Sequence, residues 1–173
     1  MKNLILRYGL YSGAVSAALM LFMAYRIEQS QSFGGEEVYG YGGMILSMLF
    51  VYLGVRLFRD KERNGVITFG EAFKVGGLIA LISCICYVVT WMVVYEYIMP
   101  DFLDKYITFA LDKMKASGAT AAEIETTTAE MAKYKTMYAN PLLRAALTFI
   151  EPLPVALGMS LISAAILRKK ASL

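Results

Sequence analysis

Four apolar stretches, each long enough to cross a lipid bilayer, place the strongest constraint on the fold of this chain. They cover roughly residues 8–25, 39–58, 73–98 and 145–167. An α-helix rises 1.5 Å per residue, so about 20 mostly apolar residues span the hydrocarbon core of a membrane. The pattern therefore predicts an all-α, polytopic membrane protein, with four transmembrane helices in a single membrane domain over residues 1–173.

The composition supports a membrane protein and excludes several functions. Hydrophobic residues make up 58% of the chain and charged residues 18%, below the roughly 25% that is usual in soluble domains. The mean hydropathy is +0.53. Outside the apolar stretches no basic cluster alternates with aromatic residues, so nucleic acid is not expected as a partner. The chain has no histidine, the commonest metal ligand and general base.

Basic residues predict the orientation in the membrane. Ten of them precede the first stretch, join the second to the third, or follow the fourth: Lys2, Arg7, Arg56, Arg59, Lys61, Arg63, Lys74, Arg168, Lys169 and Lys170. The short connection 27–38 instead carries Glu28, Glu36 and Glu37, with Arg26 at its edge. The long third connection counts less in the positive-inside rule. Both termini and the middle loop are therefore predicted to be cytoplasmic.

The cytoplasmic loop contains a turn signal and a helix cap. Asn64-Gly65 favours a turn. Thr68 and Glu71 then form a capping box, in which each side chain accepts a hydrogen bond from the other residue's backbone. This cytoplasmic cap explains Glu71 at the start of the third helix. An ion-coupling pair of Glu71 with Lys74 at the cytoplasmic mouth is the functional alternative.

The connection between the third and fourth stretches predicts an external helical hairpin over residues 101–138. Pro100 marks the break that precedes it. Apolar side chains recur at helical spacing opposite polar ones in its first half: Leu103, Ile107, Ala110 and Met114 against Asp104, Thr108, Asp112 and Lys115. This spacing predicts an amphipathic helix, which Gly118 ends. Thr120 and Glu123 form a capping box for the second helix. The hairpin is expected to lie on the bilayer surface, cap the bundle or receive a partner.

Small residues recur four positions apart within the stretches. Gly9 and Gly13 form a G-x-x-x-G pattern, and similar pairs follow in the other three stretches. Such faces let helix backbones approach closely in lipid. Two interpretations remain open, a homodimer face on the first helix or helix contacts within one bundle. Cys84 and Cys86 are two apart on a helix and do not face each other, so we expect packing residues and no disulfide between them.

The fourth stretch contains an acid within a proline-broken helix. Glu151 lies about 9 Å of helix inside the predicted outer boundary. Pro152 and Pro154 remove backbone donors and should kink or unwind the helix there. Broken helices with an acid at membrane depth occur at transporter sites. The alternative is a kinked helix with Glu151 at the wet interface.

These features define a candidate buried polar site near the outer leaflet. Its members are Glu151, Glu96, Arg26 and Arg144. Glu151 is expected to face the protein interior and to pair with Arg26, Arg144, Tyr95 or Tyr97. Glu96 and Glu151 could also form an intramembrane carboxylate pair. The sequence has no recognisable catalytic motif, P-loop or metal-ligand spacing. We therefore expect no enzyme activity, cofactor or metal.

The chain resembles the domain-of-unknown-function family numbered 4199, small membrane proteins found mostly in Bacteroidota. Three segments carry the resemblance: ITFGEAFKVG at 67–76, Pro100-Asp101-Phe102, and FIEPLPVALGMSLISAAILR at 149–168. The resemblance extends over essentially the whole chain. It implies four transmembrane helices and a multi-pass location in the bacterial inner membrane. It implies no activity and no functional residues.

Two functions from different classes remain open from the sequence. The first is a non-enzymatic membrane subunit or scaffold, in contact with the lipid bilayer and with a second copy or another membrane protein. The second is a small oligomeric ion-coupled transporter or channel that uses Glu151. A dry bundle would favour the first function, and a wet cavity at Glu151 would favour the second.

Overall fold

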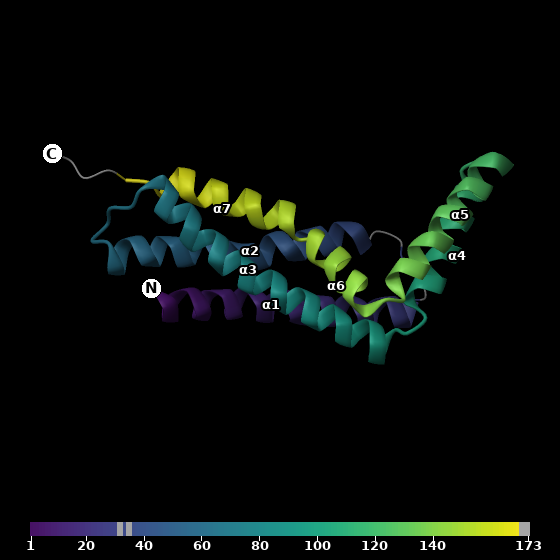
Figure 1. The fold of residues 1–173 in the computed structure, drawn as a ribbon, viewed down its shortest axis with the longest axis horizontal. Helices are drawn as coiled ribbons and strands as arrows, with labels where there is room; N and C mark the ends of the chain where they lie inside the picture. Colours follow the sequence, from purple (N-terminus) through teal and green to yellow (C-terminus); the bar gives the residue numbers. More distant parts are fainter. Residues whose placement is uncertain (31–32, 34–35, 170–173) are drawn as a thin grey trace.

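A computed structural model shows a long bundle of helices with a helical hairpin at one end (Figure 1). It describes the chain except residues 31–32, 34–35 and 170–173, and for Glu36 and Glu37 the backbone alone. The protein is 87% helical, with no strand among the described residues. The all-α prediction is thus confirmed.

The four predicted spans are all helical. They are α1 (Lys2–Ser30), α2 (Glu36–Glu62), α3 (Phe69–Val93) with the π-helix η1 (Val94–Ile98), and α6 (Pro141–Ile150) with α7 (Leu153–Leu167). All four are long and apolar enough to cross a membrane. Each helix extends beyond its apolar stretch, because the backbone hydrogen bonding continues into polar flanking residues.

The two ends of the bundle differ in what they carry. The start of α1, the end of α7 and the loop 63–68 lie at one end, which we call the termini end, and the hairpin lies at the other, the hairpin end (Figure 1). The predicted turn is present at the termini end, with φ of 50° at Asn64 and 83° at Gly65. Lys170 lies outside the described residues, as do the side chains of Glu36 and Glu37.

A short antiparallel bridge joins the loop at the termini end to the residues that follow α7. The backbone N–H of Ile67 donates to the Lys169 carbonyl at 3.1 Å, and the N–H of Lys169 donates to the Ile67 carbonyl at 2.9 Å. Ile67 is itself almost fully buried. The bridge thus fixes the start of α3 against the end of α7.

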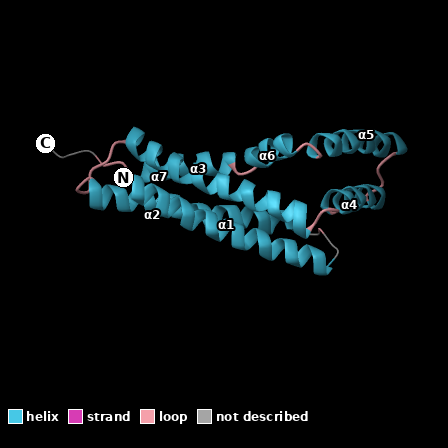
Figure 2. Ribbon diagram, turned by 60° about the horizontal axis from the view of Figure 1, so that its bottom comes forward, coloured by secondary structure: helices cyan, strands magenta, loops and turns pink. Residues whose placement is uncertain are grey.

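The hairpin consists of α4 (Phe102–Ala116) and α5 (Ala121–Tyr138), which project beyond the bundle (Figure 2). Gly118 has a φ of 82° between them, a backbone conformation that favours glycine. The predicted capping box of Thr120 and Glu123 is present. On α4 the four predicted apolar positions are buried or half-buried and the four polar ones are exposed.

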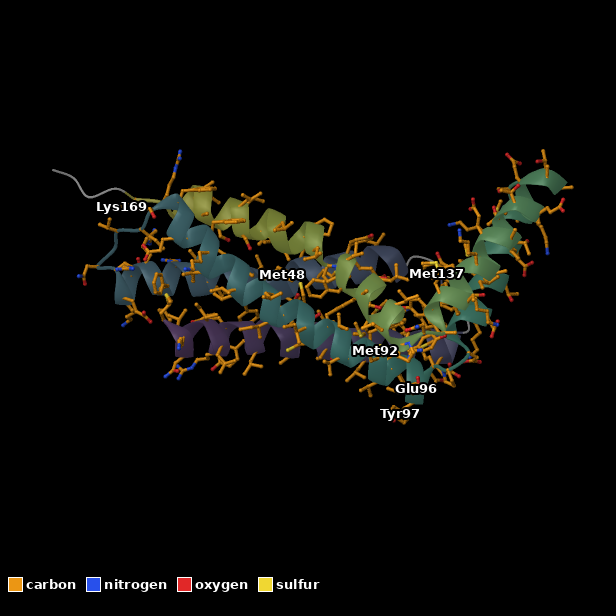
Figure 3. The ribbon with its side chains drawn as sticks, viewed as in Figure 1. Met48, Met92, Glu96, Tyr97, Met137 and Lys169 are labelled. Carbon is orange, nitrogen blue, oxygen red and sulfur yellow. The ribbon has the colours of Figure 1, made fainter. Side chains whose placement is uncertain are left out.

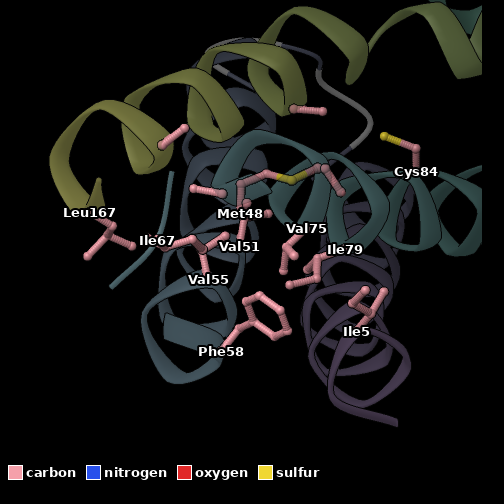
Figure 4. Close-up of a cluster of buried hydrophobic side chains, with 14 residues drawn as sticks. Ile5, Met48, Val51, Val55, Phe58, Ile67, Val75, Ile79, Cys84 and Leu167 are labelled. Carbon is pink, nitrogen blue, oxygen red and sulfur yellow. The ribbon is translucent and has the colours of Figure 1, made fainter. Parts of the chain in front are cut away.

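The termini end is filled by a compact apolar core (Figure 4). Its members come from α1, α2, α3, α7 and the bridged loop, and include Val51, Val55, Phe58, Ile67, Val75 and Ile79. Phe58 and Ile67 are 1% exposed, and Val51, Val55 and Ile79 are fully buried. This half of the bundle is therefore close-packed.

The glycine pattern on α1 is used inside the chain. A Cβ added at Gly9 would lie 2.7 Å from Cβ of Ile82, and one at Gly13 would lie 2.6 Å from Cβ of Cys86. Both neighbours belong to α3, so the G-x-x-x-G face packs α1 on α3. Of the two interpretations of this pattern, the contact within one bundle is the one observed.

Buried serines tie three helices together at the middle of the bundle. The Ser12 hydroxyl on α1 lies 2.8 Å from the Ser47 carbonyl oxygen on α2 and 2.9 Å from the Ser83 hydroxyl oxygen on α3. All three residues are buried. Polar side chains that hydrogen-bond between helices stabilise bundles in lipid, where the hydrophobic effect does not drive association.

Large apolar side chains cover the outside of the bundle. Exposed examples come from every span: Leu21, Phe22, Leu49, Val89, Leu161 and Ile166. The buried residues of α1 are mostly small, among them Gly9, Ser12, Gly13 and Ser16. Small residues inside and long apolar residues outside are expected of helices that face lipid, since soluble proteins rarely expose such large apolar surfaces.

Candidate functional site

A cavity of about 860 Å³ lies at the hairpin end, between the bundle and the hairpin. Its walls come from α1, α2, α3, α4 and α5, and from the break between α6 and α7. Lining residues include Ser16, Met20, Tyr41, Met44, Tyr87, Trp91, Phe102, Phe109, Met131, Tyr134, Tyr138 and Glu151. The volume lies within the range of small-molecule sites, which are mostly apolar with a few polar groups. We call this space the hairpin-end cavity.

An aromatic cluster holds α4 against the bundle and forms one wall of the cavity. Phe33, from the connection between α1 and α2, is 9% exposed. Its ring centroid lies 5.6 Å from that of Phe102, 5.7 Å from that of Tyr106 and 5.6 Å from that of Phe109. The Lys105 ammonium adds an ion pair to Glu28 at 3.0 Å. These contacts fix where the base of the hairpin sits.

Glu151 occupies the break in the fourth span. The α6 helix ends at Ile150 and α7 begins at Leu153, as the prolines predict. Because Pro152 and Pro154 lack an N–H, the helical donors to the carbonyls four positions earlier are missing. The break places the Glu151 side chain at the wall of the cavity.

The observed partner of Glu151 is Tyr87, which the sequence did not suggest. The Tyr87 hydroxyl donates to Oε2 of Glu151 at 3.0 Å. The expected partners Arg26, Arg144, Tyr95 and Tyr97 are not involved. Glu151 is also exposed, on the wall of the cavity. The expected partners are therefore corrected: Glu151 pairs with a tyrosine hydroxyl, but with that of Tyr87.

Arg144 forms a separate polar site, between α6 and η1. Its guanidinium donates to Oε2 of Glu96 at 3.0 Å and lies 4.3 Å from the ring centroid of Tyr95. Nε of Arg144 lies 3.4 Å from the sulfur of Met92. Arg144 is 5% exposed, whereas Glu96 points outward at the end of the bundle near Tyr97 (Figure 3). These contacts of Arg144 with Glu96 and Tyr95, which we call the Arg144 clamp, join α6 to η1.

The predicted buried polar site is therefore divided among three places. Glu151 is at the cavity, Arg144 and Glu96 form the clamp, and Arg26 lies 5.6 Å from the ring centroid of Tyr39. Only Arg144 of the four is buried, because the other three side chains lie on open faces of the hairpin end. The conceivable Glu96–Glu151 carboxylate pair is also not formed, since Glu96 binds Arg144.

The Thr68 and Glu71 cap lies far from the cavity, at the termini end. The Glu71 N–H donates to Oγ1 of Thr68 at 3.3 Å, so Thr68 caps α3 as predicted. The Glu71 carboxylate does not complete the capping box. It pairs with Arg63 of the preceding loop, and not with Lys74, because the Asn64-Gly65 turn brings Arg63 beside it.

The described residues offer no site for a metal. Among them no three His, Cys, Asp or Glu side chains come close enough to share an ion. Cys84 is a buried free thiol, and Cys86 is a free thiol packed on α1. The cavity offers a ligand aromatic faces, methionine side chains and one carboxylate.

The Glu151 carboxylate affects the pKa of a tyrosine on the α5 side of the cavity. Partial burial raises the pKa of Tyr134 to about 12, and the nearby Tyr138 hydroxyl and Glu151 carboxylate contribute to the same shift. Tyr138 lies within hydrogen-bonding distance of both the Trp91 indole N–H and Oγ1 of Thr148. These contacts bring aromatic groups of α3 and α5 toward Glu151.

Comparison with protein families settles the relationship of the chain. The model of the family described as protein of unknown function DUF4199 matches residues 7–169, nearly the whole length. The chain belongs to the DUF4199 family. No curated protein and no solved structure matches the chain significantly. The family thus agrees with the resemblance read from the sequence and assigns no activity.

Three residues of this site in a DUF4199 protein escaped sequence reasoning. Tyr87 and Trp91 lie within the apolar stretch 73–98 and Phe33 lies in the connection 27–38, and no motif marks any of them. The signal for Tyr87 and Trp91 is their i, i+4 spacing, which puts both rings on one face of α3. Phe33 had no periodic neighbour, so only the tertiary contact reveals it.

Proposed function

We propose that this protein is a non-enzymatic, multi-pass membrane subunit that binds a small apolar or amphipathic ligand in the hairpin-end cavity. The cavity itself is the observation that carries the proposal. Its volume of about 860 Å³ suits a small molecule, and its lining is rich in aromatic and methionine side chains.

The contrast with the termini end supports binding from one side. The core around Val51, Val55 and Phe58 is buried, and none of its residues lines the cavity. A ligand would enter beside the hairpin and rest above the packed core. The hairpin would cap the bundle, which is one of the three roles that its sequence suggests.

The proposed location is the bacterial inner membrane, with both termini cytoplasmic and the hairpin outside. The support is the basic residues at the termini end, read by the positive-inside rule. Cysteine labelling in spheroplasts tests this orientation, in a background that lacks Cys84 and Cys86. A cysteine replacing Ser117 in the hairpin should react with an impermeant reagent from outside. Labelling of Asn64→Cys from outside would contradict the orientation.

The proposed partners are the lipid bilayer and a second copy or another membrane protein, with no nucleic acid. The exposed side chains of the spans, such as Phe22 and Val89, supply the apolar contact surface. The Gly9 and Gly13 face is occupied by α3, so a dimer would have to use a different face from the one considered in the sequence.

Ion-coupled transport is the second candidate function, and one observation favours it. Glu151 lies at a proline-broken helix and opens onto the cavity, an arrangement found at transporter sites. A carrier would also need a second state in which the termini end opens. Flux of protons or sodium into proteoliposomes, lost in Glu151→Gln, would favour transport over simple binding.

Binding of a neutral fluorescent probe tests the main proposal. N-phenyl-1-naphthylamine should bind the full chain in nanodiscs saturably, with a single site. Gly40 lines the cavity and a Cβ there meets no atom within 4 Å, so Gly40→Phe should fill the cavity and abolish binding. Gly42 also meets nothing and does not line the cavity, so Gly42→Phe is the matched control. Equal binding by both variants would refute the proposal.

A further inference from the structure

We propose that the hairpin-end cavity selects an organic cation with an apolar body, whose charged group lies against Glu151. This inference rests on the proposed binding function and adds the charge of the ligand. Three features support this inference. They are the lack of a cationic partner for the Glu151 carboxylate, the aromatic residues that line the same cavity, and the distribution of charge along the cavity wall.

The Glu151 carboxylate has no cationic partner among the residues that the structure describes. Its one hydrogen bond comes from the Tyr87 hydroxyl to Oε2. By contrast, Glu96 at the same end of the bundle is matched by Arg144. A carboxylate at membrane depth is costly unless it is paired. A bound cation would supply the pairing that the chain leaves out.

Aromatic side chains share the cavity with this carboxylate. Tyr41, Tyr87 and Trp91 line the cavity from the bundle, and Tyr134 and Tyr138 line it from α5. Cations bind over the faces of tyrosine and tryptophan, and such aromatic cages recognise quaternary ammonium groups. A carboxylate among several aromatic rings is therefore a site for a weakly hydrated organic cation and a poor one for a small metal ion.

The charged residues on the cavity wall favour a cationic ligand over an anionic one at Glu151. The one basic residue that lines the cavity is Lys113, in the last turn of α4. It stands about 16 Å of helix beyond Phe102, which is at the base of the hairpin. At the break in the fourth span, Glu151 is the one charged residue among the described residues that line the cavity there. A cation at Glu151 has the apolar remainder of the cavity available for its body.

Two probes of equal shape and opposite charge test this inference. Tetraphenylphosphonium and tetraphenylborate would be titrated into the full chain in nanodiscs of zwitterionic lipid. Trp91 is the single tryptophan of the chain and lines the cavity, so its fluorescence reports occupancy directly. The phosphonium should change this fluorescence saturably and displace N-phenyl-1-naphthylamine, and the borate should do so at least about tenfold more weakly.

Variants of the two acids complete the test. Glu151→Gln retains an acceptor for Tyr87 but removes the charge, so phosphonium affinity should fall about tenfold while naphthylamine still binds. Glu151→Asp should keep the preference for the cation, and Glu96→Gln should leave it unchanged. Equal affinity for the two ions, or an unchanged preference in Glu151→Gln, would overturn the cation inference alone. If N-phenyl-1-naphthylamine does not bind the unmodified chain, the proposed function is overturned instead.

Discussion

The two ends of this bundle solve the packing problem differently. At the termini end, small residues and branched aliphatic side chains are buried together between α1, α2, α3 and α7. At the hairpin end, aromatic rings and methionines surround a cavity with a carboxylate on its wall. The difference shows that one cross-section of a four-helix bundle cannot combine closely approaching backbones with space for a ligand. The chain provides them at opposite ends.

The largest expected effect comes from filling the closed end. A Cβ at Gly54 would lie 2.5 Å from Cδ1 of Ile79 and 3.1 Å from Cβ of Tyr8. Gly54→Leu should therefore destabilise the protein by roughly 3 kcal/mol, at the upper end for overpacking. Gly42→Leu, in the same helix near the hairpin end, meets open space and is the control. Equal melting temperatures in detergent would show that the two ends are packed alike.

The next prediction concerns the attachment of the hairpin. Phe33→Ala removes a ring that contacts Phe102, Tyr106 and Phe109, which should cost about 2–3 kcal/mol at this peripheral cluster. The loss should be local, so amide exchange in α4 should rise while the amides of α7 stay protected. Tyr97→Ala, at a side chain 80% exposed, is the control. Uniform loss of protection would mean that the two ends fold as one unit.

A smaller effect is expected at the Arg144 clamp. Arg144→Met keeps an apolar stem but removes the ion pair to Glu96 and the contact with the Tyr95 ring. The cost should be about 1–2 kcal/mol, below that of a fully buried pair because Glu96 is exposed. Arg26→Met, which loses only a looser contact with Tyr39, should change stability by less than about 0.5 kcal/mol. The reverse order would contradict the assignment of the clamp.

The smallest effect is a pH dependence of the hairpin. The N–H and hydroxyl of Thr120 donate to Glu123 at 2.7 and 2.8 Å, and they hold the pKa of that carboxyl below its usual 4.5. A depressed folded pKa means that the cap stabilises α5 above about pH 4.5 and loses this effect as the pH falls through the folded value. Protection factors of the first turn of α5 should drop there, and Glu123→Gln should remove the change. The buried Ser12 contacts at the middle of the bundle should show no such dependence.

Local signals in the sequence predicted the elements well. The Asn64-Gly65 turn, the Thr68 cap, the Thr120 capping box and the break at Pro152 all depend on residues a few positions apart. Neighbours in sequence are neighbours in space for such features, so their chemistry is decided before the tertiary fold. The four spans followed from apolar length alone for the same reason.

The pairing of side chains across helices was not predictable in the same way. Glu151 binds Tyr87 and Arg144 binds Glu96 because of how α3 is rotated and displaced against the fourth span. The π-helix η1 adds a further shift, since its hydrogen bond from Met99 to Val94 skips one residue more than an α-helix does. A register change of this kind has no marker in the residues Val94–Ile98. The cavity depends on the same offsets, so it too appeared only with the structure.

The bridge between Ile67 and Lys169 has a consequence for the order of assembly. Its two strand-like residues are separated along the chain by α3, the whole hairpin and the broken fourth span. During synthesis α1, α2 and α3 can associate through Gly9, Gly13 and Ser12 while the rest of the chain is still absent. The bridge closes only after α7 has been synthesised, since Lys169 follows α7 in the chain. The bridge therefore forms last and joins the end of α7 to the start of α3, once the residues of α7 have completed the apolar core.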